Sequence, residues 1–262
     1  MQATLYADIN ELLETLLTRL KVVLKSRLRG LYLYGSATAG DFDQTVSDID
    51  LLAVTETDLT AEEFVALEEM HRVFALKYPG WKNRIEVGYL SLNGLQTFKH
   101  QRSRIAVISP GEPLTMKEAG NDWLINWYEV QENGIVLFGP QQAALIPEIS
   151  RAEFVAVVRA RARHWRERIR DYNAQSSSGS LAFAVFTMCR AMYACETGEQ
   201  ASKKQAAAWV AKAFPQWENL IADATAWRAA QWHEPQQWYE SALPRVVEFV
   251  GFAANQILES LP

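Results

Sequence analysis

Two aspartates, two residues apart, are the feature of this sequence best suited to chemistry. Asp48 and Asp50 stand at the start of the apolar run 49–54, which predicts a buried strand. Residues two apart on a strand project from the same face, so both carboxylates point the same way. They could simply face solvent. In a buried strand, however, a divalent cation normally relieves their repulsion, and Mg²⁺ prefers oxygen ligands that it shares with substrate phosphates.

A glycine-serine turn precedes the two aspartates. Gly35 and Ser36 follow residues 31–34, which predict a short apolar strand. Glycine allows the backbone to approach a ligand closely. Ser36 stands where a short helix, expected over residues 37–42, would present free N–H groups and a hydroxyl to an anion. A Gly-Ser pair is common, but between two strands and ahead of an acidic pair it predicts a phosphate site.

These residues belong to a predicted mixed α/β half of the chain. Thr60 and Glu63 form a capping-box pattern at the start of one helix. Residues 84–92 alternate around Ile85, Val87 and Tyr89 as a strand does, and residues 105–108 predict an edge strand. Turn formers between residues 109 and 121 suggest the end of this half. The remaining elements expected here are a helix over 6–27, the strands 31–34 and 49–54, and a helix over 60–76.

The second half of the chain predicts a helix bundle. Its apolar residues recur at helical spacing, and the short Ser/Gly run 176–180 is expected to be a loop between helices. We therefore expect two domains, residues 1–115 and 116–262. Helices are expected over residues 123–132, 151–172, 181–196, 203–213, 217–230 and 238–261.

Composition narrows the classes of function. The 262 residues are 49% hydrophobic and 22% charged, with a net charge of −5. Nucleic-acid binding is driven by Lys and Arg, so this balance disfavours a broad nucleic-acid surface and suits a small or cationic substrate. Cys189 and Cys195 lie in an apolar helical stretch and are expected to pack rather than to form a disulfide. No signal peptide or membrane span is expected, and the predicted location is the cytoplasm.

The motif resembles that of the polymerase-β-like nucleotidyltransferases, in which a Gly-Ser turn precedes Asp-x-Asp. Gly35, Ser36, Asp48 and Asp50 carry the match. Within that superfamily the chain resembles the aminoglycoside adenylyltransferases that modify streptomycin and spectinomycin. This closer resemblance rests on residues 33–37, 47–52 and 136–140, on Arg190-Ala191-Met192-Tyr193 and on Thr197-Gly198.

The resemblance implies an α/β (α+β) nucleotidyltransferase domain with a small mixed sheet, followed by an all-α helical-bundle domain, with ATP and Mg²⁺ bound between the two. It implies Mg²⁺-dependent transfer of AMP from ATP to a hydroxyl of a small molecule, with release of pyrophosphate. The acceptor would be an aminoglycoside such as streptomycin or spectinomycin. No nucleic-acid or membrane partner is implied, and the sequence leaves the oligomeric state open.

The resemblance also assigns individual residues. Glu86 takes the place of the catalytic base, and it is a charged residue between apolar neighbours in a predicted strand, although it could simply face outward. The implied metal ligands are Asp48, Asp50 and Glu86, and the implied nucleotide contacts are Gly35, Ser36, Ser47, Asp122, Lys203 and Trp227. Of the nucleotide contacts, Asp122 could instead be a helix N-cap and Lys203 a solvated surface residue.

One loop departs from the streptomycin-modifying enzymes. They carry acidic residues and a tryptophan before the Arg-x-x-Tyr helix, whereas residues 175–180 here contain no carboxylate. Two alternatives to a small-molecule acceptor stay open. One is transfer to a protein or RNA hydroxyl, with RNA disfavoured by the acidic balance. The other is a catalytically silent nucleotide-binding module, which has no chemical need for Ser36, Asp48, Asp50 and Glu86 together.

Overall fold

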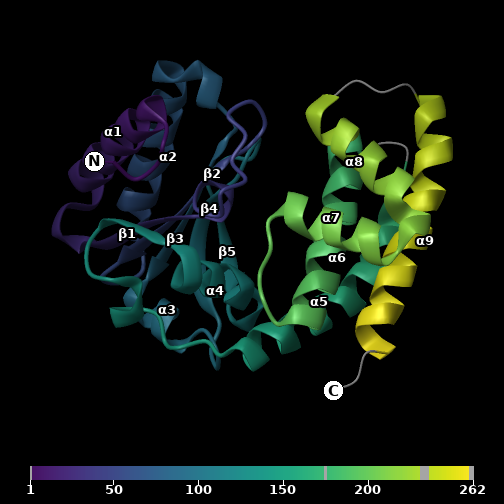
Figure 1. The fold of residues 1–262 in the computed structure, drawn as a ribbon. Coiled ribbons are helices and arrows are strands. Elements are labelled where there is room, and N and C mark those ends of the chain that lie inside the picture. Colours follow the sequence, from purple (N-terminus) through teal and green to yellow (C-terminus); the bar gives the residue numbers. More distant parts are fainter. Residues whose placement is uncertain (1, 174–175, 231–235, 260–262) are drawn as a thin grey trace. The chain divides into compact units, whose positions relative to one another are not determined.

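The protein is described by a computed structural model over residues 2–173, 176–230 and 236–259. The chain divides into two compact units, Met1–Ile149 and Ser150–Pro262 (Figure 1). The first unit is a sheet with helices, and the second contains helices. The expected order of a mixed α/β half followed by a helical half is therefore confirmed.

A six-stranded mixed sheet forms the centre of the first unit. Its strand order is β5-β4-β3-β2-β1-β6. Strands β2 and β3 are parallel and all other neighbours are antiparallel. A parallel pair needs a crossover, and the helix between β2 and β3 supplies it. The strands are β1 (Leu28–Tyr34), β2 (Ile49–Thr55), β3 (Ile85–Ser91), β4 (Ser103–Ile108), β5 (Thr115–Ala119) and β6 (Ile135–Phe138).

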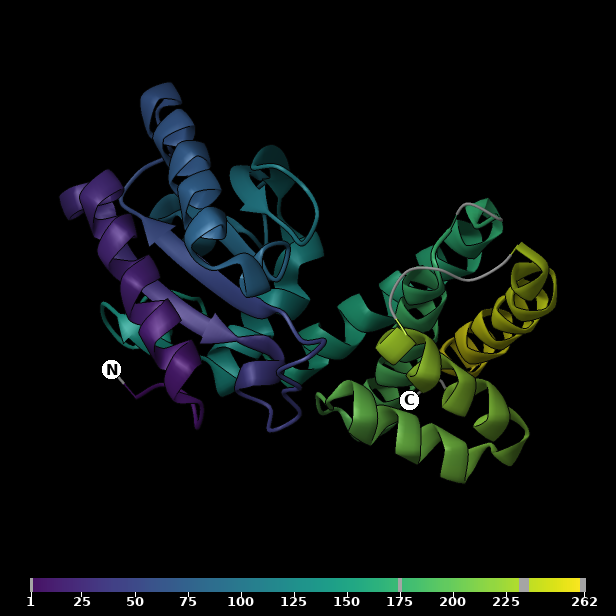
Figure 2. The same ribbon diagram turned by 90° about the horizontal axis from the view of Figure 1, so that it is seen from above.

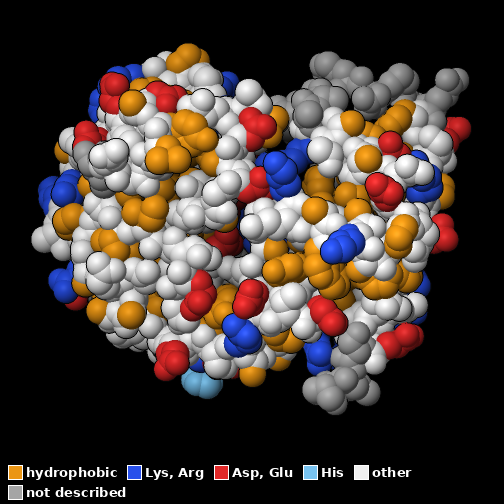
Figure 3. Space-filling model, in the orientation of Figure 1, with side chains coloured by type: hydrophobic (Ala, Val, Ile, Leu, Met, Phe, Trp, Pro, Cys, Tyr) orange, Lys and Arg blue, Asp and Glu red, His pale blue; other side chains and the backbone are white. Residues whose placement is uncertain are grey.

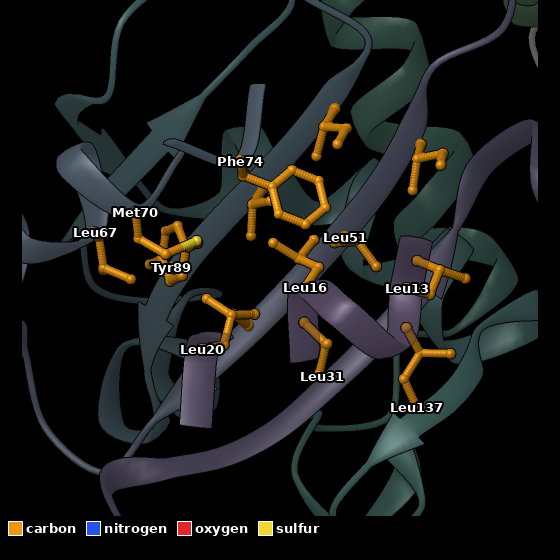
Figure 4. Close-up of a cluster of buried hydrophobic side chains, with 14 of the residues drawn as sticks. Leu13, Leu16, Leu20, Leu31, Leu51, Leu67, Met70, Phe74, Tyr89 and Leu137 are labelled. Atoms are coloured by element: carbon orange, nitrogen blue, oxygen red, sulfur yellow. The ribbon is translucent and has the colours of Figure 1, made fainter. Parts of the chain in front are cut away.

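Two long helices cover one face of this sheet. They are α1 (Ala7–Leu24) and α2 (Ala61–Lys77), which contact each other and are seen from above in Figure 2. The predicted capping box at Thr60 and Glu63 is present at the start of α2. Leucines of α1 and the apolar side of α2 close over alternate residues of the strands, and the resulting core is drawn in Figure 4. Its labelled members are Leu13, Leu16, Leu20, Leu31, Leu51, Leu67, Met70, Phe74, Tyr89 and Leu137.

The other face of the sheet receives two helices. Helix α3 (Leu92–Thr97) contacts β2 and β3, and helix α4 (Leu124–Asn133) contacts β1. Because successive strand residues point to opposite faces, Asp50 points away from the core to which Ile49 and Leu51 belong. The alternation therefore brings the acidic residues to the α3 and α4 side of the sheet.

The first unit is longer than residues 1–115, where we expected it to end. The turn formers after Ser109 close a hairpin between β4 and β5 instead of separating domains. Strand β4 is therefore an inner strand, not the expected edge. The chain then continues through α4 into β6, which pairs with β1 at the opposite side of the sheet. A four-residue strand paired with a segment a hundred residues earlier has no local signature in the sequence.

The second unit is built around helix α6, which contacts all four of its other helices. Ser177 caps α6, so residues 178–180 form its first turn rather than part of a loop. Gln175, at the start of the acid-free loop, lies outside the described residues. Both cysteines are free thiols. The helices are α5 (Arg151–Arg168), α6 (Ser178–Thr197), α7 (Lys203–Ala213), α8 (Glu218–Ala230) and α9 (Gln236–Glu259).

The surface carries both signs of charge. Acidic and basic side chains are interspersed over the visible face of the first unit in Figure 3. In the part of the chain that is described, every helix is too short or too polar to cross a membrane.

Candidate active site

Gly35 and Asp50 are in direct contact at the end of β1. The register pairs Tyr34 with Asp50 across β1 and β2. Gly35 follows with φ 74°, in the left-handed region that favours glycine. A Cβ at this position would collide with the carboxylate of Asp50, whose Cγ would lie 2.9 Å away. The motif therefore couples a backbone turn to the position of one acidic side chain.

Asp50 and Glu86 are neighbours on the two parallel strands. The register of β2 and β3 pairs Asp50 with Glu86, between the pairs Ile49–Ile85 and Leu51–Val87. Paired residues of adjacent strands project to the same face of the sheet. Asp48 lies two residues before Asp50, and its charge acts on Glu86. Three carboxylates predicted from the sequence are thus brought together at one end of two strands.

Burial has the largest effect on the pKa of Glu86, and its polar neighbours add smaller ones. Burial raises the pKa of the Glu86 carboxyl, the Ser109 hydroxyl lowers it by hydrogen bonding, and the charge of Asp48 raises it further. Lys117 lowers the pKa and Glu112 raises it to a smaller extent. A carboxyl with a raised pKa is suited to accept a proton near neutral pH.

The β4–β5 hairpin supplies the neighbours of Glu86 that the sequence did not indicate. The N–H of Glu112 donates to the carbonyl of Ser109 at 3.0 Å, which closes the turn. Lys117 pairs with Glu112 at 3.2 Å. Ser109 directly follows β4, and it comes beside Glu86 only because β4 runs antiparallel to β3. That pairing has no signal in the sequence.

Tyr34 is a second neighbour that sequence reasoning missed. It is buried, with 4% of its surface exposed. Burial and then the charges of Asp50 and Glu86 raise the pKa of its hydroxyl, which hydrogen bonds with Asn126 of α4. Glu129 of α4 adds another negative charge to the same region. The position of Tyr34, directly before Gly35 and opposite Asp50, was a signal that could have identified it.

The turn after β1 is shorter than expected. Gly35–Ala37 form a single 3-10 turn, whose glycine carbonyl accepts the N–H groups of Thr38 and Ala39 at 3.1 and 3.2 Å. The helix expected over residues 37–42 is absent from this described segment. The first N–H groups of a 3-10 turn have no partner within it, so Ser36 still presents backbone donors and a half-buried hydroxyl.

Ser47 is held by contacts within the protein, and its expected contact with nucleotide stays a prediction. It is 1% exposed, and its hydroxyl accepts the N–H of Asp43 at 3.0 Å. Its carbonyl accepts both Nε and Nη2 of Arg84 at 3.1 and 2.5 Å. Arg84 also donates to the carbonyl of Gln44 at 2.8 Å. Ser47 and Arg84 therefore hold the segment that delivers Asp48.

Asp122 lies in a different setting from the one expected. It belongs to a 3-10 turn, Asn121–Trp123, and α4 after it is part of the first unit. Its Oδ1 accepts the N–H of Gly120 at 2.9 Å, and its Oδ2 lies 3.8 Å from Arg102. The residue at the N-cap of α4 is Trp123, so Asp122 does not cap that helix.

Lys203 and Trp227 both belong to the second unit. Lys203 is the first residue of α7, after the capping residue Ser202. Trp227 is buried in α8, with 7% exposed, and packs edge-to-face on Trp238 at 4.9 Å between centroids. Packing therefore accounts for most of the surface of Trp227. Their contact with nucleotide stays a prediction.

The carboxylates fit a magnesium ion that is completed by substrate. Asp48, Asp50 and Glu86 offer the hard oxygen donors that Mg²⁺ prefers, and burial and then the charge of Asp48 raise the pKa of Glu86. Among the described residues, no three His, Cys, Asp or Glu side chains form a ready-made metal cage. Mg²⁺ usually takes one or two carboxylates and fills its shell with water and phosphate oxygens, which this arrangement allows.

Comparisons with known proteins concern the C-terminal part of the chain and the overall fold. The family model described as aminoglycoside adenylyltransferase, C-terminal domain, matches residues 144–256. No curated protein matches the sequence. A crystal structure of spectinomycin adenyltransferase AAD(9) from Enterococcus faecialis, with ATP and spectinomycin, shares the fold. Its TM-score is 0.74 at 17% sequence identity, over 95% of this chain and 99% of that chain.

The likeness confirms the fold class expected from the sequence, a nucleotidyltransferase domain followed by a helical domain. The family match begins at residue 144, shortly before the second unit, and covers nearly all of that unit. Residues 144–256 are therefore similar to the C-terminal domain of the aminoglycoside adenylyltransferases, and the chain shares its fold with a spectinomycin adenyltransferase.

Proposed function

We propose that the protein transfers AMP from ATP to a hydroxyl of an aminocyclitol or aminoglycoside, with Mg²⁺, and releases pyrophosphate. The observation that carries this proposal is the register that sets Asp50 beside Glu86, with Gly35 packed against Asp50 and Asp48 acting on Glu86. This arrangement combines a place for phosphates, two metal-binding carboxylates and one carboxyl suited to accept a proton.

Each residue has one part in the proposed reaction. Ser36 and the N–H groups of its turn bind the terminal phosphates. Asp48 and Asp50 hold Mg²⁺, which supplies neutralisation of the charge on the phosphate oxygens. Glu86 accepts the proton of the acceptor hydroxyl as that oxygen attacks the α-phosphorus in line. The bond from the α-phosphorus to the bridging oxygen breaks, and pyrophosphate leaves.

Several residues position this site without taking part in bond making. Arg84 and Ser47 hold the segment before Asp48, and Ser109 orients the Glu86 carboxyl. Positioning of this kind contributes much of the rate in phosphoryl-type transfers.

We also propose that Lys203 and Trp227 contact the nucleotide from the second unit, with Trp227 limited to its small exposed edge. For Asp122 we propose an indirect part, through the start of α4. We place the reaction in the cytoplasm, where ATP and Mg²⁺ are available.

Spectinomycin is the acceptor that we favour over streptomycin. The similar structure AAD(9) is a spectinomycin enzyme crystallised with ATP and spectinomycin. Residues 175–180 of this chain contain no carboxylate, whereas the streptomycin-modifying enzymes that the sequence resembles carry acidic residues before the Arg-x-x-Tyr helix. Binding strongly cationic streptomycin removes water from its charged groups, and nearby carboxylates offset this cost. Because this loop has no carboxylate, it attracts streptomycin less.

The test is pyrophosphate release from ATP and Mg²⁺ in the presence of spectinomycin, streptomycin, a bulk RNA and a bulk protein fraction. We expect release that depends on spectinomycin. Asp48→Asn is expected to abolish it while the protein stays folded. The matched control is Asp58→Asn, which removes the same charge from an exposed residue of the first unit. An Asp48→Asn variant as active as Asp58→Asn contradicts the proposed metal site.

A further inference from the structure

A cavity that the proposed reaction does not use lies in the first unit. It has a volume of about 510 Å³ and opens between α2, the start of β3 and the β4–β5 hairpin. This volume falls within the ~300–1,000 Å³ typical of small-molecule sites. Its walls are largely apolar, and Phe74, Ile85 and Leu114, each at most 9% exposed, form the inner part. Phe74 is drawn in Figure 4.

The mouth of the cavity is nearly neutral. Glu69 of α2 is paired with Arg72 at 2.7 Å, and Glu112 of the hairpin is paired with Lys117 at 3.2 Å. Glu68 and Lys82 at the rim have opposite charges. An occupant therefore meets apolar walls and a mouth with little net charge. These properties favour a neutral, mostly apolar molecule over an anion or a polycation.

His71 adds one polar group to this apolar wall. It is 6% exposed, and its Nε2 lies 2.6 Å from the hydroxyl oxygen of Tyr89, the only hydrogen bond of its ring among the described residues. Burial lowers the pKa of His71 to about 4, so the ring is neutral at pH 7. The buried hydroxyl of Tyr89 needs a hydrogen-bond acceptor, so it donates its proton to Nε2 of His71 in a hydrogen bond. The neutral imidazole ring then carries its own N–H on Nδ1.

The hairpin at the cavity also lies at the proposed active site. Ser109 and Glu112 line the cavity, while Ser109 hydrogen bonds with Glu86 and the charge of Glu112 acts on it. The two residues belong to one hydrogen-bonded turn, closed by the N–H of Glu112 on the carbonyl of Ser109. A molecule that presses on Glu112 therefore also moves or fixes Ser109.

We propose that this cavity is an effector site for a neutral aromatic or alicyclic molecule with one hydrogen-bond acceptor, which the Nδ1–H of His71 recognises. Its occupation is transmitted to Glu86 through the turn of Ser109 and Glu112. The binding step is independent of catalysis. The transmission step rests on the function proposed above, and separate measurements test the two.

The first experiment measures binding without turnover. The probe is prodan, a neutral naphthyl ketone whose emission reports an apolar surrounding. We expect saturable binding to the native chain and at least tenfold weaker binding to Ala75→Phe, which fills the cavity from α2. The matched control Ala66→Phe places the same ring on an exposed position of α2 outside the cavity lining and should bind as the native chain does. Absent saturable binding, or equal binding to both variants, overturns the site.

Three further measurements test recognition by His71, the location of the probe and transmission to Glu86. His71→Phe removes the N–H at similar volume and should weaken prodan about three- to tenfold, the usual net worth of one hydrogen bond. In the native chain we expect an NMR contact between prodan and the methyl groups of Leu114, a measurement that does not depend on any variant folding. In the native chain, prodan should change kcat for pyrophosphate release, and this change should be absent in Ala75→Phe. A native kcat that prodan leaves unchanged overturns the transmission to Glu86.

Discussion

Replacing Gly35 by alanine tests the contact on which the proposed site depends. Gly35 has φ 74°, and a left-handed conformation costs a residue with a Cβ about 1–2 kcal/mol. In addition, the new methyl group would overlap the Asp50 carboxylate, which must then move. Displacing a group that holds or orients a metal typically costs ~10–100-fold. We expect kcat/KM for pyrophosphate release to fall by about 10–100-fold, with a raised Mg²⁺ requirement.

Gly40→Ala is the matched control for this prediction. Gly40 also has φ 74°, but a Cβ there meets no atom within 4 Å. The two variants share the backbone strain and the lower entropy of the unfolded chain, so the difference between them isolates the overlap with Asp50. Urea denaturation and pyrophosphate release are measured for both. If Gly35→Ala is as active as Gly40→Ala, the coupling of turn and carboxylate is refuted.

Four further predictions concern Glu86 and the segment before Asp48. Glu86→Gln should retain ATP binding in calorimetry while kcat falls ~10²–10⁴-fold, the usual contribution of a positioned base. Because the pKa of Glu86 is raised in the folded state, its ionisation opposes folding as the pH rises through that pKa, so Glu86→Gln should have a higher Tm at pH 7 than the native chain. The native kcat/KM should fall as the pH drops through a value above ~4.3, the ordinary pKa of glutamate. Ser109→Ala removes the hydrogen bond that lowers the pKa of Glu86, so it should move this fall to higher pH. A pH profile that Ser109→Ala leaves unmoved would contradict the assignment of Glu86 as base. Arg84→Met removes the donors to the Ser47 carbonyl and should raise the Mg²⁺ concentration for half-maximal activity roughly tenfold, with unchanged secondary structure by circular dichroism.

Local patterns in the sequence were sufficient for the two halves of the chain and for the chemistry of the motif. The capping box at Thr60 and the helical spacing of apolar residues depend on neighbours a few positions away, so they can be recognised without the fold. The alternation expected of a strand likewise predicted that Asp48 and Asp50 share one face. The residue types then pointed to a metal and phosphates.

Sheet pairing was beyond local patterns. Residues 109–121 contain turn formers that suit a domain boundary as well as a hairpin, and only the pairing of β4 with β5 distinguishes the two. Strand β6 completes the sheet beside β1 through contacts across about a hundred residues. The expected end of the first domain at residue 115 was wrong because such long-range pairing leaves no periodic trace in a four-residue strand.

The residue types and their order in the sequence by themselves determined which groups could act: a glycine turn, two aspartates and a glutamate on a later strand. Only the tertiary structure decided that Glu86 stands beside Asp50, that Ser47 faces inward, and that Ser109 hydrogen bonds with Glu86. The physical reason is that charge interactions and burial depend on distances through space. These distances follow from strand register, which every strand of the sheet sets together.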